Sequence, residues 1–296
     1  MNSSVVGRGI ALSVAASALF ALFAAYTRLL SPLGGVDIFA WRIVWTVPGA
    51  LLLVAWRSRL PQLRDLLVQA SRAPRLAFKL VTCAALMGSQ LLLFMWAPLH
   101  GHMLEVSLGY FLLPLSMVLV GRFYYREELA RLQWLAVACA AIGVAHELRA
   151  THAFSWPTLV VVLGYPPYFV VRRTIASDSL VTFATEVLLL LPAAIWLIAT
   201  SATAHAAFHL PVLGALLLPG LGALSTIALA CYLKASRLMP MALFGILGYV
   251  EPVLIVLVSV LLLGETLRAG QLATYVPIWF AVAITAAHAV LLLRSR

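Results

Sequence analysis

Long runs of apolar residues alternate along the chain with short segments that are polar and mostly basic. Most runs approach the roughly 20 apolar residues that an α-helix needs to cross a bilayer. Each run predicts a helix, because a backbone in lipid must satisfy its amides within its own segment. The pattern predicts an all-α integral membrane protein with ten transmembrane helices, at about 8–30, 37–56, 76–97, 103–121, 132–148, 156–172, 182–200, 211–232, 242–262 and 272–293.

Two segments allow more than one interpretation. Arg8 and the small residues at 16–18 resemble a signal peptide, but the apolar run continues to Tyr26 and favours a spanning helix. The stretch 57–75 is basic and too short for a soluble domain. We therefore expect a cytoplasmic loop there.

Composition and charge agree with this topology. Hydrophobic residues make up 64% of the 296 residues and charged residues only 10%, which is too few to cover a water-facing surface. If the N-terminus is cytoplasmic, 16 of the 20 basic residues fall inside and only Arg28, Arg149 and Arg268 fall outside. This bias predicts that both termini are cytoplasmic. It also explains the net charge of +10 without a nucleic-acid partner.

Parts of the first half recur in the second half. Phe39-Ala40 matches Phe183-Ala184 at an offset of 144 residues. A longer set matches at an offset of 139 residues up to the tyrosine and 138 after it. This set consists of Leu108-Gly109-Tyr110, Pro114, Glu127 and Gln133 in the first half, and Leu247-Gly248-Tyr249, Pro252, Glu265 and Gln271 in the second.

The repeat predicts two units of five helices each, at 1–148 and 155–293. Because five is odd, the second unit enters the membrane from the opposite side, so the repeat is inverted. Exchanging the conformations of two inverted halves turns an inward-open cavity outward, which is how many secondary transporters achieve alternating access. The sequence therefore predicts a transporter.

The motifs that end each repeat resemble the EamA family of the drug/metabolite transporter superfamily. Each has a proline, about a dozen apolar residues and then Glu-x-Leu, as in Pro114 to Leu129 and Pro252 to Leu267. Trp41-Arg42 and the stretch 102–111 also resemble the RarD branch. Gln90-Leu91 and Glu251 depart from that branch. The resemblance implies a bacterial inner-membrane exporter of a small metabolite, such as an amino acid or a drug-like compound.

Ionisable residues inside membrane helices are candidate site residues, because each costs a few kcal/mol to insert. Arg42 and Glu105 lie at similar depths near the outer side, so a salt bridge between them is one interpretation. The other is that Arg42 binds a substrate carboxylate and Glu105 reorients it. Glu186 lies at a different depth, and we do not pair it with Arg42. Glu251, near the midplane beside Pro252, is with Glu186 a candidate for proton coupling; the alternative is a buried acid bonded by hydroxyls.

Other candidates follow from the repeat. Pro114 and Pro252 predict a pair of interrupted helices around a central cavity. Tyr110 and Tyr249 are candidates to line it, with ordinary helix packing as the alternative. Gln90 is a substrate-binding candidate or an interhelical hydrogen-bonding residue. Glu127 and its counterpart Glu265 are predicted to cap helices or anchor loops.

The remaining polar inventory predicts no catalytic residue, metal site or cofactor, since metalloprotease, P-loop and serine-hydrolase motifs are missing from the sequence. We therefore expect a secondary transporter and no enzyme, with a small-molecule substrate, membrane lipids and a proton gradient as its partners. A lipid flippase or scramblase is an alternative, and an intramembrane transferase is a weaker one. The sequence does not decide between a monomer and a homodimer.

Overall fold

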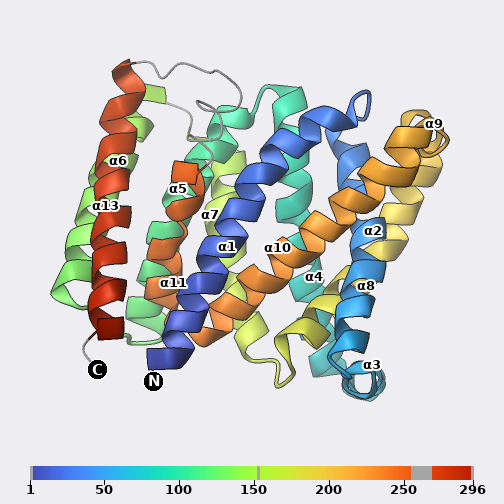
Figure 1. Ribbon diagram of the computed structural model, residues 1–296, viewed down its shortest axis with the longest axis horizontal. Helices are drawn as coiled ribbons and strands as arrows, with labels where there is room; N and C mark the ends of the chain where they lie inside the picture. The colour runs from blue at the N-terminus through green and yellow to red at the C-terminus, as the bar shows by residue number, and fades with distance from the viewer. Residues whose placement is uncertain (1–2, 152–153, 255–268, 295–296) are drawn as a thin grey trace. The chain divides into compact units, whose positions relative to one another are not determined.

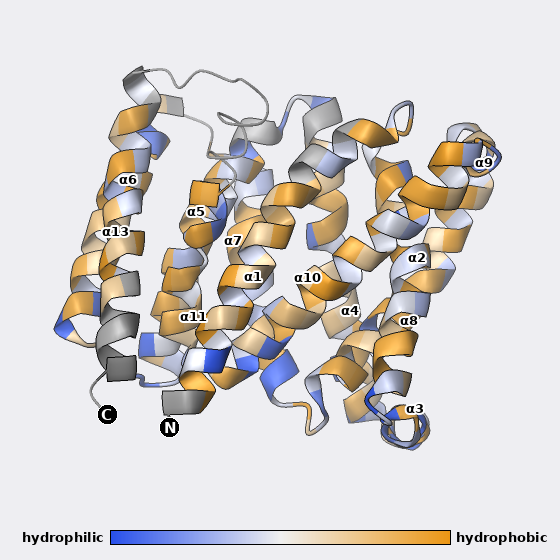
Figure 2. Cartoon of the chain, in the orientation of Figure 1, coloured by the Kyte–Doolittle hydropathy of each residue, from blue (hydrophilic) through white to orange (hydrophobic). Residues whose placement is uncertain are grey.

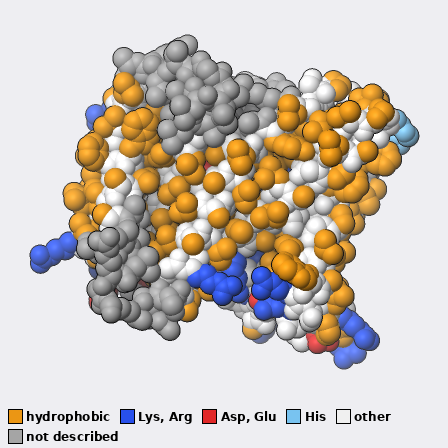
Figure 3. Space-filling model, viewed as in Figure 1, with side chains coloured by type: hydrophobic (Ala, Val, Ile, Leu, Met, Phe, Trp, Pro, Cys, Tyr) orange, Lys and Arg blue, Asp and Glu red, His pale blue; other side chains and the backbone are white. Residues whose placement is uncertain are grey.

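A computed structural model describes residues 3–151, 154–254 and 269–294 (Figure 1). These residues form helices and connecting turns, with no strand among them. Hydrophobic side chains dominate most helices and cover much of the visible described surface (Figures 2 and 3). The chain is thus an all-helical, multi-pass membrane protein, as its sequence predicts.

Most of the long helices follow the predicted apolar runs, whereas the short helices at 60–72 and 202–208 lie between runs. They are α1 (Ser3–Thr27), α2 (Gly35–Trp56), α3 (Leu60–Arg72), α4 (Pro74–Trp96), α5 (Met103–Leu119), α6 (Arg131–Thr151), α7 (Trp156–Arg173), α8 (Ser179–Thr200), α9 (Ala202–Phe208), α10 (Leu218–Leu238), α11 (Met241–Leu247) and α13 (Ala269–Arg294). Short 3₁₀ turns, Arg28–Leu30 and Ala97–His100, follow α1 and α4. π-Helical turns, Val120–Tyr124 and Leu213–Leu217, follow α5 and precede α10.

Six described helices are long and apolar enough to cross a membrane, at Val5–Phe23, Gly35–Trp56, Pro74–Trp96, Glu105–Tyr124, Ser179–Thr200 and Leu213–Leu238. Two shorter apolar helices lie at Met241–Leu254 and Leu272–Thr285. The predicted run 242–262 ends outside the described residues. The count of ten spans therefore stays a prediction.

The segment 57–75 is largely helical, so an irregular loop there is wrong, while its cytoplasmic side stays a prediction. Pro61 lies in the first turn of α3, where its missing N–H has no helical partner to lose. Leu63 and Leu66 are buried, and α3 packs against α4 and α8. The apolar residues recur at spacings of three and four, which is typical of an amphipathic helix. The abundance of arginine concealed this periodicity.

The described helices belong to two compact units, and each unit is described by itself. Unit 1 comprises Met1–Leu22, Leu104–Pro166 and Lys234–Arg296; unit 2 comprises Phe23–Met103 and Pro167–Leu233. Each unit therefore takes helices from both halves of the sequence. The boundaries of the predicted repeats, 1–148 and 155–293, describe a different division and stay a prediction.

In unit 2, α2 packs along α8, and α4 packs against both. The repeat-matched pairs Phe39-Ala40 and Phe183-Ala184 are all buried. At the N-terminus of α2, a Cβ on Gly35 would lie 1.7 Å from the carbonyl oxygen of Met95. Only glycine allows α2 to approach the end of α4 so closely.

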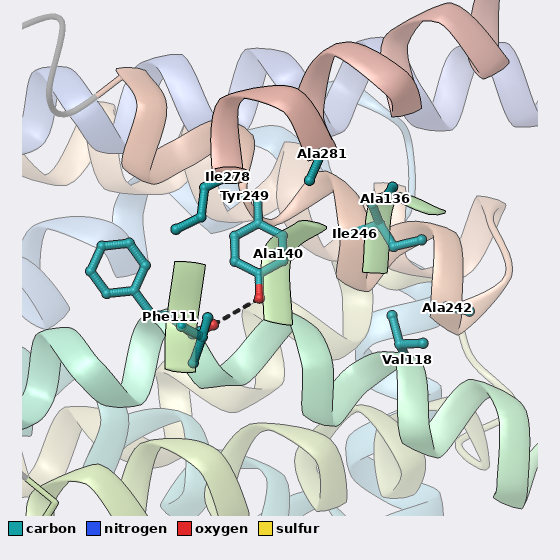
Figure 4. Close-up of a cluster of buried hydrophobic side chains, with 10 residues drawn as sticks. Phe111, Val118, Ala136, Ala140, Ala242, Ile246, Tyr249, Ile278 and Ala281 are labelled. Atoms are coloured by element: carbon teal, nitrogen blue, oxygen red, sulfur yellow. Dashed lines mark hydrogen bonds between the residues drawn. The ribbon is translucent and has the colours of Figure 1, made fainter. Parts of the chain in front are cut away.

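In unit 1, α6 packs along α13, and α11 packs against both. A buried hydrophobic cluster joins these helices to α5 (Figure 4). Three alanines, Ala136, Ala140 and Ala281, are among its members and are fully buried. Such small side chains let helix backbones approach closely, which is how helices associate in lipid.

Candidate functional site

Arg42 is buried in α2 of unit 2, with 3% of its surface exposed. Its Nε donates a hydrogen bond of 2.8 Å to Oγ of Ser225 in α10. Its guanidinium carbon lies 4.3 Å from the centre of the Phe23 ring, a cation–π geometry. A buried guanidinium in a spanning helix is costly to place, so Arg42 remains the strongest candidate for recognising an anion.

Buried hydroxyl groups accompany Arg42 between α2 and α10. Thr46 Oγ1 donates to the carbonyl oxygen of Arg42 at 2.6 Å, and Thr226 Oγ1 donates to that of Thr46 at 3.4 Å. Ser225 and Thr226 were missed in the sequence, although adjacent hydroxyl residues in the apolar run 211–232 were the available signal. Together with Arg42 and Thr46, these two residues form a buried polar strip between α2 and α10 of unit 2.

Glu186 is fully buried in α8 and forms an ion pair with Arg172. The Nε of Arg172 donates to Oε1 at 3.0 Å and to Oε2 at 3.4 Å, and the Tyr168 hydroxyl donates to Oε2 at 3.2 Å. The Nη2 of Arg172 donates to the carbonyl oxygen of Ser179 at 2.8 Å. Both charges are therefore extensively hydrogen-bonded within unit 2.

Arg172 is a residue whose setting the sequence did not predict. Its place in the last turn of α7 made it count as a charge on the cytoplasmic side. The missed signal is the short connection to α8, since two antiparallel helices joined this way bring Glu186 within reach of a long arginine side chain. The charge bias alone does not show which arginines turn inward.

In unit 1, Tyr110 of α5 faces Tyr165 of α7. Their hydroxyl oxygens are 3.4 Å apart, and their ring centres are 6.1 Å apart. Nearer the N-termini of the same two helices, Thr158 Oγ1 donates to the carbonyl oxygen of Glu105 at 2.7 Å. Glu105 belongs to unit 1 and Arg42 to unit 2, so their salt bridge stays a prediction.

Tyr249 is buried in the hydrophobic cluster of unit 1. Its hydroxyl donates to the carbonyl oxygen of Phe111 at 2.9 Å (Figure 4). Phe111 lies three residues before Pro114 in α5. The contact favours a packing role for Tyr249, which is one of the two alternatives that the sequence left open.

The backbone differs at the two prolines that were predicted to interrupt their helices, Pro252 and Pro114. α11 ends at Leu247, Gly248 and Tyr249 form a turn, and residues 250–254 are helical again. Pro252 has no N–H to offer to Gly248, and Glu251 instead donates its N–H to Gly248 at 3.4 Å. By contrast, α5 runs through Pro114 without a break.

The remaining candidates are single residues. Gln90 is buried in α4, whereas Glu251 is half-buried. Glu127 accepts the N–H groups of Met241 at 2.6 Å and Ala242 at 2.8 Å. It therefore caps the N-terminus of α11, and the capping prediction is confirmed. Its counterpart Glu265 lies outside the described residues.

Within the described part of the chain, no group of three His, Cys, Asp or Glu side chains is arranged to hold a metal ion. The buried charged groups described in unit 2 include the guanidinium of Arg42, which lies among hydroxyl groups, and the ion pair of Arg172 with Glu186. A guanidinium beside hydroxyl groups is able to bind an anion.

Several bacterial proteins are similar to this chain over nearly its whole length. The chloramphenicol-sensitive protein RarD of Pseudomonas aeruginosa is 48% identical over 99% of this chain and 98% of its own. An uncharacterised transporter of Pasteurella multocida is 37% identical over 98% and 99%. The RarD protein of Escherichia coli is 32% identical over 96% and 95%.

Two further comparisons bear on fold and family. A solved crystal structure shares the fold at a TM-score of 0.69, with 17% identity, and the match covers 95% of this chain and 98% of that one. No protein-family model matches the chain. The wider EamA assignment is not named by these relatives and stays a prediction, but the RarD part of the resemblance is confirmed. The chain belongs to the family of RarD proteins and related bacterial membrane transporters.

Proposed function

We propose that this protein is a secondary transporter that exports a small metabolite carrying a carboxylate, such as an amino acid or a similar zwitterion. The observation that carries the proposal is the buried guanidinium of Arg42, held by Ser225 and Phe23. A guanidinium binds carboxylates with charge-assisted hydrogen bonds. Relatives named as transporters support the general class, and the resemblance of the sequence to EamA exporters supports the direction of transport.

Alternating access between two inverted repeats is the proposed mechanism. It is supported by the way that repeat-matched helices pack: α2 lies along α8, and α6 lies along α13. Pairing of equivalent elements is what a two-fold relation between the halves would produce. We further propose ten spans, with both termini in the cytoplasm, in the inner membrane of a bacterium.

Coupling to protons is the proposed energy source, with Glu251 and Glu186 as the carriers. Glu251 is half-buried beside the break in its helix. Glu186 is held by Arg172, so taking up a proton requires that this ion pair opens. Transport and opening of the pair would then be linked.

Proteoliposomes with an imposed pH gradient test the proposal. The probes are labelled amino acids and, because of the name of the Pseudomonas relative, uncharged chloramphenicol. Loss of a charge-assisted hydrogen bond costs about 1.5–3 kcal/mol, so Arg42→Gln should lower the transport of amino acids by about tenfold or more. Arg131→Gln, an exposed arginine at the start of α6, is the matched control.

Two results would count against these proposals. Equal transport of amino acids by the Arg42→Gln and Arg131→Gln variants would remove Arg42 from the site. Unchanged dependence on the pH gradient after both Glu251→Gln and Glu186→Gln would remove proton coupling.

A further inference from the structure

One flank of α3 exposes alternating apolar and basic side chains. Leu60, Arg64, Val68 and Arg72 follow each other at a spacing of four residues, so they form one row along the helix. Leu67 lies beside this row. We call these five residues the α3 surface.

The α3 surface is separate from the side of α3 that packs on the protein. Leu63 and Leu66 are 6% and 5% exposed and lie on the side that packs on unit 2. In contrast, Leu60, Leu67 and Val68 are 48%, 41% and 40% exposed. The helix therefore has a second apolar flank that the described residues leave uncovered.

The position of α3 is fixed by an ion pair at its start. Arg59 immediately precedes the helix and pairs with Asp178. Asp178 in turn accepts the N–H of Leu180 at 2.8 Å and caps α8. Arg59 thus links the start of α3 to α8, whereas Arg64 and Arg72 are exposed.

The surroundings of α3 are strongly basic and bear exposed aromatic rings. Segment 56–79 holds six basic residues and one acidic residue, Asp65. Trp56 and Phe78 are about three-quarters exposed near the neighbouring ends of α2 and α4, and Arg57 lies 5.5 Å over the Trp56 ring. Figure 3 shows Lys and Arg side chains at the corner where Figure 1 places α3.

We propose that the α3 surface binds the headgroups of anionic phospholipids. Its leucine and valine side chains would enter the boundary of the acyl chains, while Arg64 and Arg72 extend to the phosphates, as arginines at membrane surfaces do. Charge complementarity identifies the occupant, because the cytoplasmic leaflet attracts basic segments close to the ends of membrane helices. The exposed Leu60, Leu67 and Val68 suit acyl chains better than an acidic protein surface.

Lipid retention tests this proposal. The full-length protein is purified in detergent with equimolar phosphatidylglycerol and phosphatidylcholine, and retained lipids are counted by native mass spectrometry. Each basic residue near an anionic surface strengthens its attraction about fivefold. The Arg64→Gln/Arg72→Gln variant should therefore lose at least about fivefold in the retained ratio of phosphatidylglycerol to phosphatidylcholine.

Matched variants and a second measurement locate the effect. Arg131→Gln/Arg149→Gln removes two exposed arginines at the ends of α6 and should keep the ratio of the native protein. The Arg64→Lys/Arg72→Lys variant keeps the charge and should also keep the lipid ratio of the native protein. A photo-crosslinking residue at Val68 should capture phosphatidylglycerol in native membranes.

The proposal is overturned if the two Arg→Gln pairs change the ratio equally. It is also overturned if Val68 captures a protein and no lipid. The crosslinking result does not depend on the arginine variants, and neither measurement involves transport. The choice of the cytoplasmic leaflet rests on the proposed topology, but both measurements stand apart from the proposed transport.

Discussion

At the scale of single residues, Glu186 and Arg172 depend on each other, because each compensates the buried charge of the other. Both side chains are essentially fully buried and joined by two hydrogen bonds. Removing one partner of a buried ion pair typically costs about 3–5 kcal/mol, whereas replacing both with apolar residues of similar size is often neutral. The cost of replacing either residue therefore depends on whether the other is still present.

Glu186→Leu should lower the melting temperature of the purified protein strongly, because it leaves the Arg172 guanidinium buried without its carboxylate. Glu186→Leu combined with Arg172→Met should recover most of that loss. Tryptophan fluorescence during heating measures both. If the double variant melts no higher than the single one, the buried pair does not account for the loss.

Tyr249→Phe separates packing from substrate contact. The change removes the hydrogen bond to the carbonyl oxygen of Phe111, and a buried group left without its partner costs about 1–3 kcal/mol. We expect a lower melting temperature with transport per folded molecule unchanged. Unchanged stability with reduced transport would instead place Tyr249 in the substrate path.

At the scale of elements, the start of α11 depends on a side chain from a distant part of the sequence. Glu127 accepts hydrogen bonds from the first two N–H groups of α11. A Cβ on Gly121 would lie 2.7 Å from Oε2 of Glu127. Gly121 thus leaves room for the carboxylate. The π-helical turn after α5 and the start of α11 are held together by this contact.

Glu127→Ala should destabilise the protein by about 1–2 kcal/mol, as expected for a lost helix cap. Glu128→Ala is the matched control, since Glu128 is the exposed neighbour, and it should have little effect. Chemical denaturation in mixed micelles compares the two. Equal effects would mean that the cap contributes nothing measurable.

The sequence predicted the positions of the helices better than the contacts between their side chains. Apolar runs of spanning length located the helices well because lipid demands them, and they matched α2 and α8 to within a few residues. α3 was missed because the arginines of segment 57–75 are typical of a loop and mask the helical spacing of its apolar residues. The Arg172–Glu186 pair was missed because it depends on the register between α7 and α8, which composition does not specify.

At the scale of the whole molecule, the inverted repeat makes a prediction about sidedness. The segment between the second and third predicted spans holds α3, and its counterpart between the seventh and eighth holds α9. Equivalent segments of inverted halves must face opposite compartments. The basic residues of segment 57–79 and their absence from 201–210 agree with α3 inside and α9 outside.

Cysteine labelling in intact cells tests this sidedness. The three native cysteines, Cys83, Cys139 and Cys231, are replaced by serine, and one new cysteine is introduced at Gln62 in α3 or at His205 in α9, both exposed. A membrane-impermeant maleimide should label His205→Cys in spheroplasts, and Gln62→Cys only after the membrane is opened. Labelling of both in intact spheroplasts would put the two segments on the same side. The halves would then not be inverted, and alternating access by exchange of their conformations would lose its physical basis.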